Sequence, residues 1–287
     1  MGRQVVNRDN ELIGPERVAL VTGGSSGIGL ALARLLAQKG CHVWLVARQQ
    51  DRLAAALEEV NAARQSARQL CGAVSADVSD PAQAFATAEQ VARESGAPHL
   101  LVNSAGVARP GYFQELDLEA FRWMMDINYF GTVHMIKAIL PGMLRRGSGH
   151  IVNISSIAGF LGTFGYSAYG ASKFAITGFS DVLRAELKPH GIRVSIVFPP
   201  DVDTPQLAYE KPFRPAETRL LVDGGLILSP EAVAATILRG VSRNRYIIIP
   251  GAMGKALYWL THVLGSAAYP VMDWFVAPAR RQASKNR

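Results

Sequence analysis

Residues 18–29 read VALVTGGSSGIG, a short apolar run followed at once by a glycine-rich turn. A chain that turns tightly, admits a pyrophosphate close to its backbone and packs a helix against a strand needs several glycines, and Gly23, Gly27 and Gly29 meet this need. The helix that begins there points its free N–H groups at the phosphates. An ordinary strand–helix turn also uses glycine, but the position between an apolar strand and a helical pattern favours a dinucleotide site. The sequence therefore predicts a cofactor turn made of Gly23, Ser25, Ser26, Gly27, Ile28 and Gly29.

The same alternation of strand and helix continues along the chain. Seven apolar runs have strand character: Val18–Val21, His42–Ala47, Leu70–Val74, Leu100–Asn103, His150–Ile154, Val194–Phe198 and Tyr246–Ile249. Six helical patterns lie between them: Leu30–Gln38, Arg52–Arg64, Pro81–Glu94, Leu118–Leu144, Ser172–Lys188 and Pro230–Gly240. Continuous apolar strands that alternate with helices are typical of a parallel sheet buried on both faces. With right-handed crossovers, the pattern predicts an α/β protein, a doubly wound Rossmann-type sheet of about seven strands. One domain, residues 16–250, follows an N-terminal segment, 1–15.

The composition indicates a folded and moderately basic protein. Of the 287 residues, 49% are hydrophobic and 18% are charged, which excludes a disordered, a collagen-like or a disulfide-stapled chain. Cys41 and Cys71 lie in apolar runs and are expected to be buried free thiols, and the six scattered histidines predict no metal site. The net charge of +7 suits solubility, anionic phosphate ligands or an anionic membrane surface, and no nucleic-acid partner is expected. Because the N-terminus has no apolar run typical of a signal peptide, we expect the protein on the cytosolic side.

The end of the second strand bears on the choice of cofactor. An acidic residue about twenty positions after the glycine turn would bind the ribose 2′-hydroxyl of NAD. Here Arg48 stands nineteen residues after Gly29, and Arg52 follows one helical turn later. Cations suit a 2′-phosphate, so the cofactor is expected to be NADPH/NADP+. The alternative is that Arg48 is only a solvated arginine at a strand end. Further cofactor contacts are expected where the third and fourth strands end, at Asp77, Val78, Asn103, Ala105 and Gly106.

Four polar residues together predict a catalytic group. Tyr169 and Lys173 are four residues apart and share one helix face, and Ser156 closes the fifth strand thirteen residues before Tyr169. A lysine cation and a nicotinamide charge would lower the pKa of the tyrosine, which then exchanges a proton with a carbonyl oxygen. Ser156 would hydrogen-bond that oxygen, and Asn128 would hold a water beside Lys173. Ser155 competes with Ser156 for its role, and each of these residues alone has an ordinary structural explanation.

The glycine turn, Asn103–Gly106 and the four polar residues resemble the short-chain dehydrogenase/reductases over about residues 16–250. The resemblance implies a single Rossmann domain, nicotinamide hydride transfer, the catalytic roles given above, and a homodimer or homotetramer. Two positions depart from the family pattern: Ser104 replaces the commoner alanine, and Pro199-Pro200 replaces Pro-Gly. The threonine that meets the nicotinamide amide is kept as Thr204, so Pro199, Val202 and Thr204 are expected at the cofactor.

Within that family, four segments resemble the 3-ketodihydrosphingosine (3-dehydrosphinganine) reductases: 165–169, 172–176, 199–205 and 215–220. This resemblance implies NADPH-dependent reduction of the 3-keto group of a long-chain sphingoid base. A dehydrogenase for another lipid, such as a steroid or a retinoid, is an alternative. A non-catalytic NADP(H)-binding sensor is a second alternative, although such a protein has no need of all four catalytic residues.

Two segments lie outside the strand–helix alternation. Residues 199–229 are rich in proline and are expected to form a substrate loop or lid. The extension 251–287 contains Ala256–Met272, seventeen residues without Asp, Glu, Lys or Arg, and ends with a basic tail. The run is shorter than a comfortable span of about twenty residues. We expect a membrane-lying or shallowly inserted helix pair, with packing on the domain or in an oligomer interface as the alternative.

Overall fold

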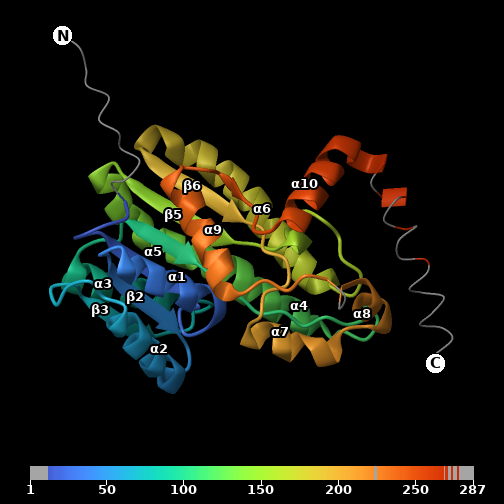
Figure 1. The fold of residues 1–287 in the computed structure, drawn as a ribbon, viewed down its shortest axis with the longest axis horizontal. Coiled ribbons are helices and arrows are strands. Elements are labelled where there is room, and N and C mark those ends of the chain that lie inside the picture. The colour runs from blue at the N-terminus through green and yellow to red at the C-terminus, as the bar shows by residue number, and fades with distance from the viewer. Residues whose placement is uncertain (1–11, 223–224, 268, 271–272, 274–276, 278–287) are drawn as a thin grey trace, which may run out of the picture.

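The architecture is a single parallel sheet of seven strands, seen in a computed structural model that describes residues 12–222, 225–267, 269–270, 273 and 277 (Figure 1). The strand order is β3-β2-β1-β4-β5-β6-β7. The strands are β1 Val18–Thr22, β2 His42–Ala47, β3 Cys71–Ser75, β4 Leu100–Asn103, β5 Gly149–Ile154, β6 Ile192–Val197 and β7 Ile247–Ile248. The predicted doubly wound Rossmann-type sheet is therefore confirmed. The chain reverses its direction of winding between β1 and β4, and ligands of such sheets bind at the carboxyl ends of the strands near that point.

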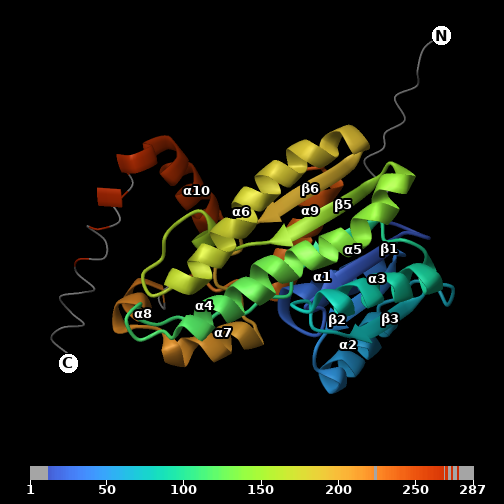
Figure 2. The ribbon, with the colours of Figure 1, turned by 180° about the vertical axis from the view of Figure 1, so that it is seen from behind.

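Helices cover both faces of the sheet, which explains why the strands are apolar throughout (Figures 1 and 2). One face carries α1 Gly27–Gln38, α2 Gln50–Ala62 and α9 Pro230–Ser242. The other carries α3 Pro81–Ser95, α5 Gly131–Arg146 and α6 Ser167–Leu187. In β1, Ala19 and Val21 belong to the core on the first face, while Val18 and Leu20 belong to the core on the second.

The predicted long helix Leu118–Leu144 is interrupted, so that prediction was wrong in detail. The structure has α4 Leu118–Met124, then a π-helical turn Met125–Phe130, then α5. A π turn adds one residue to the helical repeat, and such turns occur mostly at functional sites. Hydrophobic periodicity did not reveal it because the apolar faces before and after the turn both reach the core. Helix α6 begins at Ser167, five residues before the predicted start, which places Tyr169 in its first turn.

The segment 199–229 is not a bare loop. It contains α7 Pro205–Glu210, a 3-10 turn Lys211–Phe213 and α8 Ala216–Val222. The backbone of Val202 pairs with that of Leu228, which closes the base of the segment. We call the described residues of this segment, 199–222 and 225–229, the lid. It lies at the carboxyl end of the sheet, at the same end of the molecule as α10 Ala252–Leu264 (Figure 1).

Two sequence-based expectations about the rest of the chain can be compared with the structure. Both cysteines are free thiols, but only Cys41 is fully buried, since Cys71 lies on the edge strand β3. Among the helices that the structure describes, none is both long and apolar enough to cross a bilayer.

A buried histidine lies in the middle of the sheet. The Nε2 atom of His150 is 2.8 Å from Ser195 Oγ, and Ser195 donates its own proton to the carbonyl of Arg245. His150 Nε2 therefore carries the hydrogen, and its Nδ1 has no partner within the described chain. Burial, with a smaller contribution from the charge of Arg193, lowers the pKa of His150 to about 3.

This pKa predicts a loss of stability in acid. A histidine in the unfolded chain titrates near 6.5, above the folded value, so the unfolded state binds the proton first as the pH falls. The free energy of unfolding should drop between pH 6.5 and pH 3, by about 2 kcal/mol from this residue alone between pH 8 and pH 5. Urea unfolding at each pH measures it. His150→Gln should reduce the drop and leave the part that comes from His99, whose pKa burial lowers to about 4. His190→Gln, in the exposed turn after α6, should leave the drop unchanged; equal slopes in all three proteins would contradict the assignment.

Candidate active site

The glycine turn at the carboxyl end of β1 is shaped for a phosphate. Gly23 and Gly27 have φ of +64° and +55°, which other residues rarely adopt. A Cβ atom on Gly23 would lie 2.8 Å from the backbone nitrogen of Ala105, and one on Gly29 would collide with the carbonyl oxygen of Gly23. Ser26 begins α1 without a side-chain cap, and the first turn of the helix holds no acidic residue. The N–H groups of this turn are therefore available to an anion, and the site fits a dinucleotide.

The residues expected at the adenosine end come together where β2 and β3 end. The guanidinium of Arg48 lies 3.9 Å from Asp77 Oδ2 and is half-exposed. The other oxygen of Asp77 accepts hydrogen bonds from the backbone and hydroxyl of Ser79. Val78 is buried, and Arg52 is exposed in the first turn of α2. Arg48 therefore offers a cation next to a carboxylate at the edge of the site.

The catalytic candidates Ser156, Tyr169 and Lys173 are brought together. Ser156 follows β5, and its hydroxyl is close enough to the Tyr169 hydroxyl to offset part of the rise in pKa that burial gives that phenol. Lys173 lies one helical turn after Tyr169, with its Nζ 5.6 Å from the centre of the tyrosine ring. That Nζ donates a hydrogen bond to the carbonyl of Ile154 at the end of β5, at 3.0 Å. These contacts bring the hydroxyls of Ser156 and Tyr169 and the amine of Lys173 together at the carboxyl edge of the sheet.

The two serines point in different directions. Ser155 is buried, and its hydroxyl donates to the backbone carbonyl of Lys173 at 3.1 Å. It lies close to Thr177 as well, so it faces the backbone of α6. Ser156 is the one that faces the phenol of Tyr169.

Asn128 is buried in the π turn, and its side-chain amide forms hydrogen bonds to groups of other segments. Its amide donates to the carbonyl of Val107 and to the hydroxyl of Ser172, both at 2.9 Å, and its Oδ1 accepts from the N–H of Val107. Both amide hydrogens are thus used to hold the segment after β4 against α6. A Cβ on Gly106 would lie 3.3 Å from Asn128 Oδ1 and 3.5 Å from Lys173 Nζ, so both atoms face this glycine. The predicted water beside Lys173 would have to bind through Asn128 oxygen atoms, and this role stays a prediction.

Two other expected cofactor residues have structural partners. Asn103 is buried and donates to Asn153, which in turn donates to Ser180 on α6, so these amides tie β4 and β5 to the helix. Thr204 caps α7, and a Cβ on Gly27 would lie 2.8 Å from its methyl group. The start of the lid therefore lies against the glycine turn, and the contact of Thr204 with the nicotinamide stays a prediction. The carbonyl of Pro199 accepts from Ile157, beside Ser156.

The predicted lowering of the tyrosine pKa depends on Lys173 together with the nicotinamide charge, and it stays a prediction. Burial raises the pKa of Tyr169, and the charge of Glu210 adds to the increase. Burial also lowers the pKa of Lys173, to about 8. Tyr169 therefore keeps its proton at neutral pH, which is the form that a ketone reduction needs in order to donate it.

A buried polar network in the lid was missed by the sequence analysis. The hydroxyl of Tyr166 donates to Glu210 at 3.0 Å and accepts from Arg214 at 2.9 Å. Arg214 also pairs with Asp201 at 2.7 Å. Gln206 donates to Glu210 at 2.8 Å and is close enough to the Tyr169 hydroxyl to lower the pKa of Tyr169 against the effect of burial. No periodic pattern in the lid indicated these contacts, since they join residues up to 48 positions apart.

The family of the chain follows from comparison with known proteins. A family model described as short chain dehydrogenase matches residues 17–214, so the chain belongs to this family, whose members are oxidoreductases acting on CH–OH or C=O groups. It is similar to the 3-ketodihydrosphingosine reductases of Mus musculus and Bos taurus, at 39% and 38% identity over 257 residues, or 87% of this chain and 77% of each relative. Among solved structures it resembles a short chain dehydrogenase/reductase from Burkholderia phymatum in complex with NAD. The TM-score is 0.79 at 27% identity, covering 90% of this chain and 96% of that one.

The two serines give a prediction with a built-in comparison. Ser156→Ala should lower kcat by about 10²-fold or more, because the carbonyl oxygen loses a hydrogen-bond donor that strengthens in the transition state. Ser155→Ala should lower the free energy of unfolding by about 1 kcal/mol and change kcat little, because its hydroxyl contacts only the α6 side. Steady-state kinetics and urea unfolding of both variants measure this. A larger loss of kcat in Ser155→Ala than in Ser156→Ala would reverse the assignment.

Proposed function

We propose that this protein reduces the 3-keto group of a long-chain 3-keto sphingoid base to a hydroxyl group with NADPH. The observation that carries the proposal is the meeting of the Tyr169 and Ser156 hydroxyls beside the glycine turn, under a lid. The similarity to reductases named for 3-ketodihydrosphingosine extends over 87% of the chain and supports this substrate.

The residues present account for the proton side of the reaction. Ser156 and Tyr169 hydrogen-bond the ketone oxygen, which orients the carbonyl and withdraws electrons from its carbon. The nicotinamide, when bound, supplies a hydride to that carbon. Tyr169 donates its phenolic proton to the oxygen as the C–O double bond becomes single, so hydride and proton together give the hydroxyl product. The nearby Lys173 ammonium stabilises the phenolate that is left.

The preference for NADPH is inferred from Arg48 and Arg52. Both lie at the edge of the site where the adenosine ribose of a Rossmann cofactor is bound, and Arg48 stands at the end of β2. A 2′-phosphate would accept a charge-assisted hydrogen bond from Arg48, which is already oriented by Asp77.

Arg48→Gln should therefore lower the ratio of kcat/KM for NADPH to that for NADH. A loss of one charge-assisted hydrogen bond is worth about 1.5–3 kcal/mol, or about tenfold to a hundredfold in the ratio. Arg34→Gln, which removes an exposed arginine paired with Glu59 on the outside of α1 and α2, is the matched control and should leave the ratio unchanged. An unchanged ratio in Arg48→Gln would assign the discrimination to Arg52 or to neither arginine.

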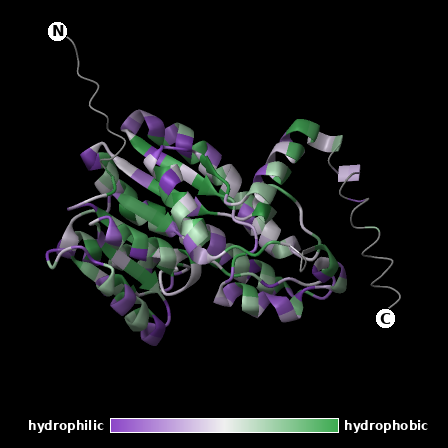
Figure 3. Cartoon of the chain, in the orientation of Figure 1, coloured by the Kyte–Doolittle hydropathy of each residue, from purple (hydrophilic) through white to green (hydrophobic). Residues whose placement is uncertain are grey.

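We also propose that α10 lies on an anionic lipid surface. One side of α10 packs on the domain: the ring of Tyr258 is 5.1 Å from that of Phe160 and 5.9 Å from that of Phe198. Trp259 and Val263 on the other side are 68% and 77% accessible. The hydropathy colouring of Figure 3 shows apolar residues along α10. The helix contains no acidic residue, and the sequence continues into a basic tail. An apolar face with cationic flanks is typical of interfacial helices. The location on the cytosolic side and the assembly into a dimer or tetramer stay predictions.

The double variant Trp259→Ser/Val263→Ser tests this surface without cutting the helix from the domain. Binding to vesicles that contain phosphatidylserine should fall about tenfold or more, because each exposed apolar side chain that enters the lipid contributes roughly 1–2 kcal/mol. Reduction of a short-chain ketone in solution should not change. Phe85→Ser/Val182→Ser, which removes two exposed apolar side chains elsewhere, serves as the control. Equal binding by the two double variants in co-sedimentation would rule out α10 as the membrane surface.

The proposed activity is tested by following NADPH oxidation with 3-ketodihydrosphingosine and identifying the product by mass spectrometry. The wild-type chain should form dihydrosphingosine, and Tyr169→Phe should bind NADPH normally but lose turnover by several powers of ten. Steroid and retinoid ketones are assayed alongside. If the enzyme reduces steroid or retinoid ketones efficiently and does not reduce the sphingoid ketone, the proposed substrate is wrong. Tight NADPH binding with no turnover of any ketone would indicate a sensor instead of an enzyme.

A further inference from the structure

The lid carries a buried carboxylate whose charge the reaction described above does not use. Glu210 ends α7 and is only 7% exposed. Its two oxygens accept hydrogen bonds from neutral donors, the Tyr166 hydroxyl at 3.0 Å and the Gln206 amide at 2.8 Å. Within the described part of the chain, the structure records no ion pair to Glu210. Burial raises the pKa of Glu210, and Arg214, the nearest cation in the lid network, lowers it through its charge, but Arg214 donates hydrogen bonds to Asp201 and to the Tyr166 hydroxyl.

This carboxylate lies near Tyr169, the proposed proton donor. Gln206 donates to Glu210, and both side chains are close enough to the Tyr169 hydroxyl to shift its pKa. Tyr166, the other partner of Glu210, has its ring 5.7 Å from the ring of Tyr169. Glu210 is thus one side chain away from the point where the ketone oxygen binds. The Lys173 ammonium points to the carbonyl of Ile154 at the end of β5, so it does not neutralise Glu210 by direct contact.

A buried carboxylate held only by neutral groups favours a cation at its side. Removing an ion from water is costly, and a partner of opposite charge with good hydrogen bonds offsets that cost. A sphingoid ketone brings such a partner, because an ammonium group sits on the carbon next to the ketone. Its nitrogen is three covalent bonds from the ketone oxygen, so the two atoms are within about 4 Å of each other.

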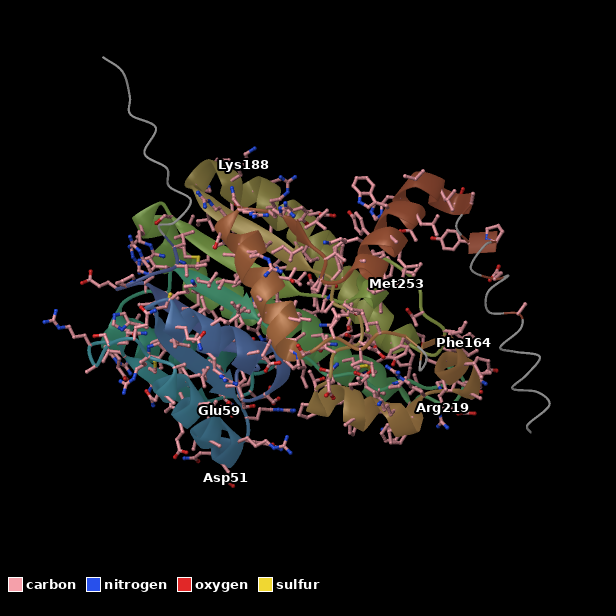
Figure 4. The ribbon with its side chains drawn as sticks, in the orientation of Figure 1. Asp51, Glu59, Phe164, Lys188, Arg219 and Met253 are labelled. Carbon is pink, nitrogen blue, oxygen red and sulfur yellow. The ribbon has the colours of Figure 1, made fainter. Side chains whose placement is uncertain are left out.

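We propose that Glu210 binds the ammonium group next to the ketone and thereby makes the enzyme select α-amino ketones over plain lipid ketones. Tyr166 and Gln206 hold the carboxylate in place, and Arg214 and Asp201 hold Tyr166 and the base of the lid. Glu210 is a specificity-determining residue for the ketone, and the inference rests on the proposed function. Figure 4 shows the lid, marked by Arg219 on α8, at the end of the molecule where α10, marked by Met253, also lies.

The test compares two substrates in three proteins. The substrates are 3-ketodihydrosphingosine and its N-acetyl derivative, which has the same chain and ketone but no positive charge. The proteins are wild type, Glu210→Gln and Glu217→Gln, each as the full chain. Glu217 is the matched control, because it lies in the same lid and accepts a hydrogen bond from a tyrosine hydroxyl, that of Tyr112, at 2.7 Å.

Glu210→Gln should lower kcat/KM for the amino ketone about tenfold to a hundredfold, mainly through KM, and should change kcat/KM for the N-acetyl ketone less than threefold. Glu217→Gln should leave the ratio of the two substrates at the wild-type value. The wild-type preference should also weaken as the pH rises above the pKa of the substrate amine, and this weakening should be absent in Glu210→Gln.

Other results distinguish a failure of this inference from a failure of the proposed function. Equal losses on both substrates in Glu210→Gln would make Glu210 a structural part of the lid and overturn the inference, while the proposed function would stand. A wild-type enzyme that reduces both ketones equally well would do the same. A wild-type enzyme that reduces neither would overturn the proposed function itself. If Glu210→Gln does not fold, the wild type still decides: dihydrosphingosine should inhibit at least tenfold more strongly than N-acetyl dihydrosphingosine, and equal inhibition would contradict the role of Glu210.

Discussion

The close approach of α1 to the end of β1 is the constraint on which the rest of the site depends. Gly29 lies so near the carbonyl of Gly23 that no side chain fits between them. The same turn contacts the segment after β4 through Gly23 and the start of the lid through Gly27. One further glycine, Gly106, leaves room for Asn128 and Lys173 to face the same point. The glycine turn, Lys173 and the lid are therefore positioned by backbone packing, and side-chain chemistry is added to a geometry that glycine makes possible.

The lid is held in a different way from the domain it covers. The domain has two large apolar cores, one on each face of the sheet. The lid is joined to its surroundings mainly by polar contacts, such as Arg214 with Asp201 and Thr218 with the carbonyl of Phe164, while Leu220, Leu221 and Leu226 remain exposed. Segments with few buried apolar contacts open at lower free energy than the core, so this construction suits an element that admits a long substrate.

Much of the fold could be predicted because its signals are local. The strands are apolar on both faces, as in Val18–Val21, and the glycine turn, Tyr169 and Lys173 lie at short fixed spacings. The π turn around Asn128 left no mark on the hydrophobic pattern. The orientations of Ser155 and Ser156 depend on α6, and Tyr166, just before α6, meets Glu210 of α7 only in the folded chain. The burial that raises the pKa of Tyr169 is likewise not stated by the sequence.

Helix α10 packs on two aromatic residues that belong to different parts of the site. Phe160 follows Ser156 by four residues, and Phe198 immediately precedes the lid; both rings contact Tyr258. A membrane contact through the outer face of α10 would therefore not act as a flexible tether. It would fix the height and tilt of the sheet above the lipid and turn its carboxyl edge toward the surface. A substrate with a long hydrocarbon tail would then need to raise only its polar head to reach the site, while the tail stays among the lipids.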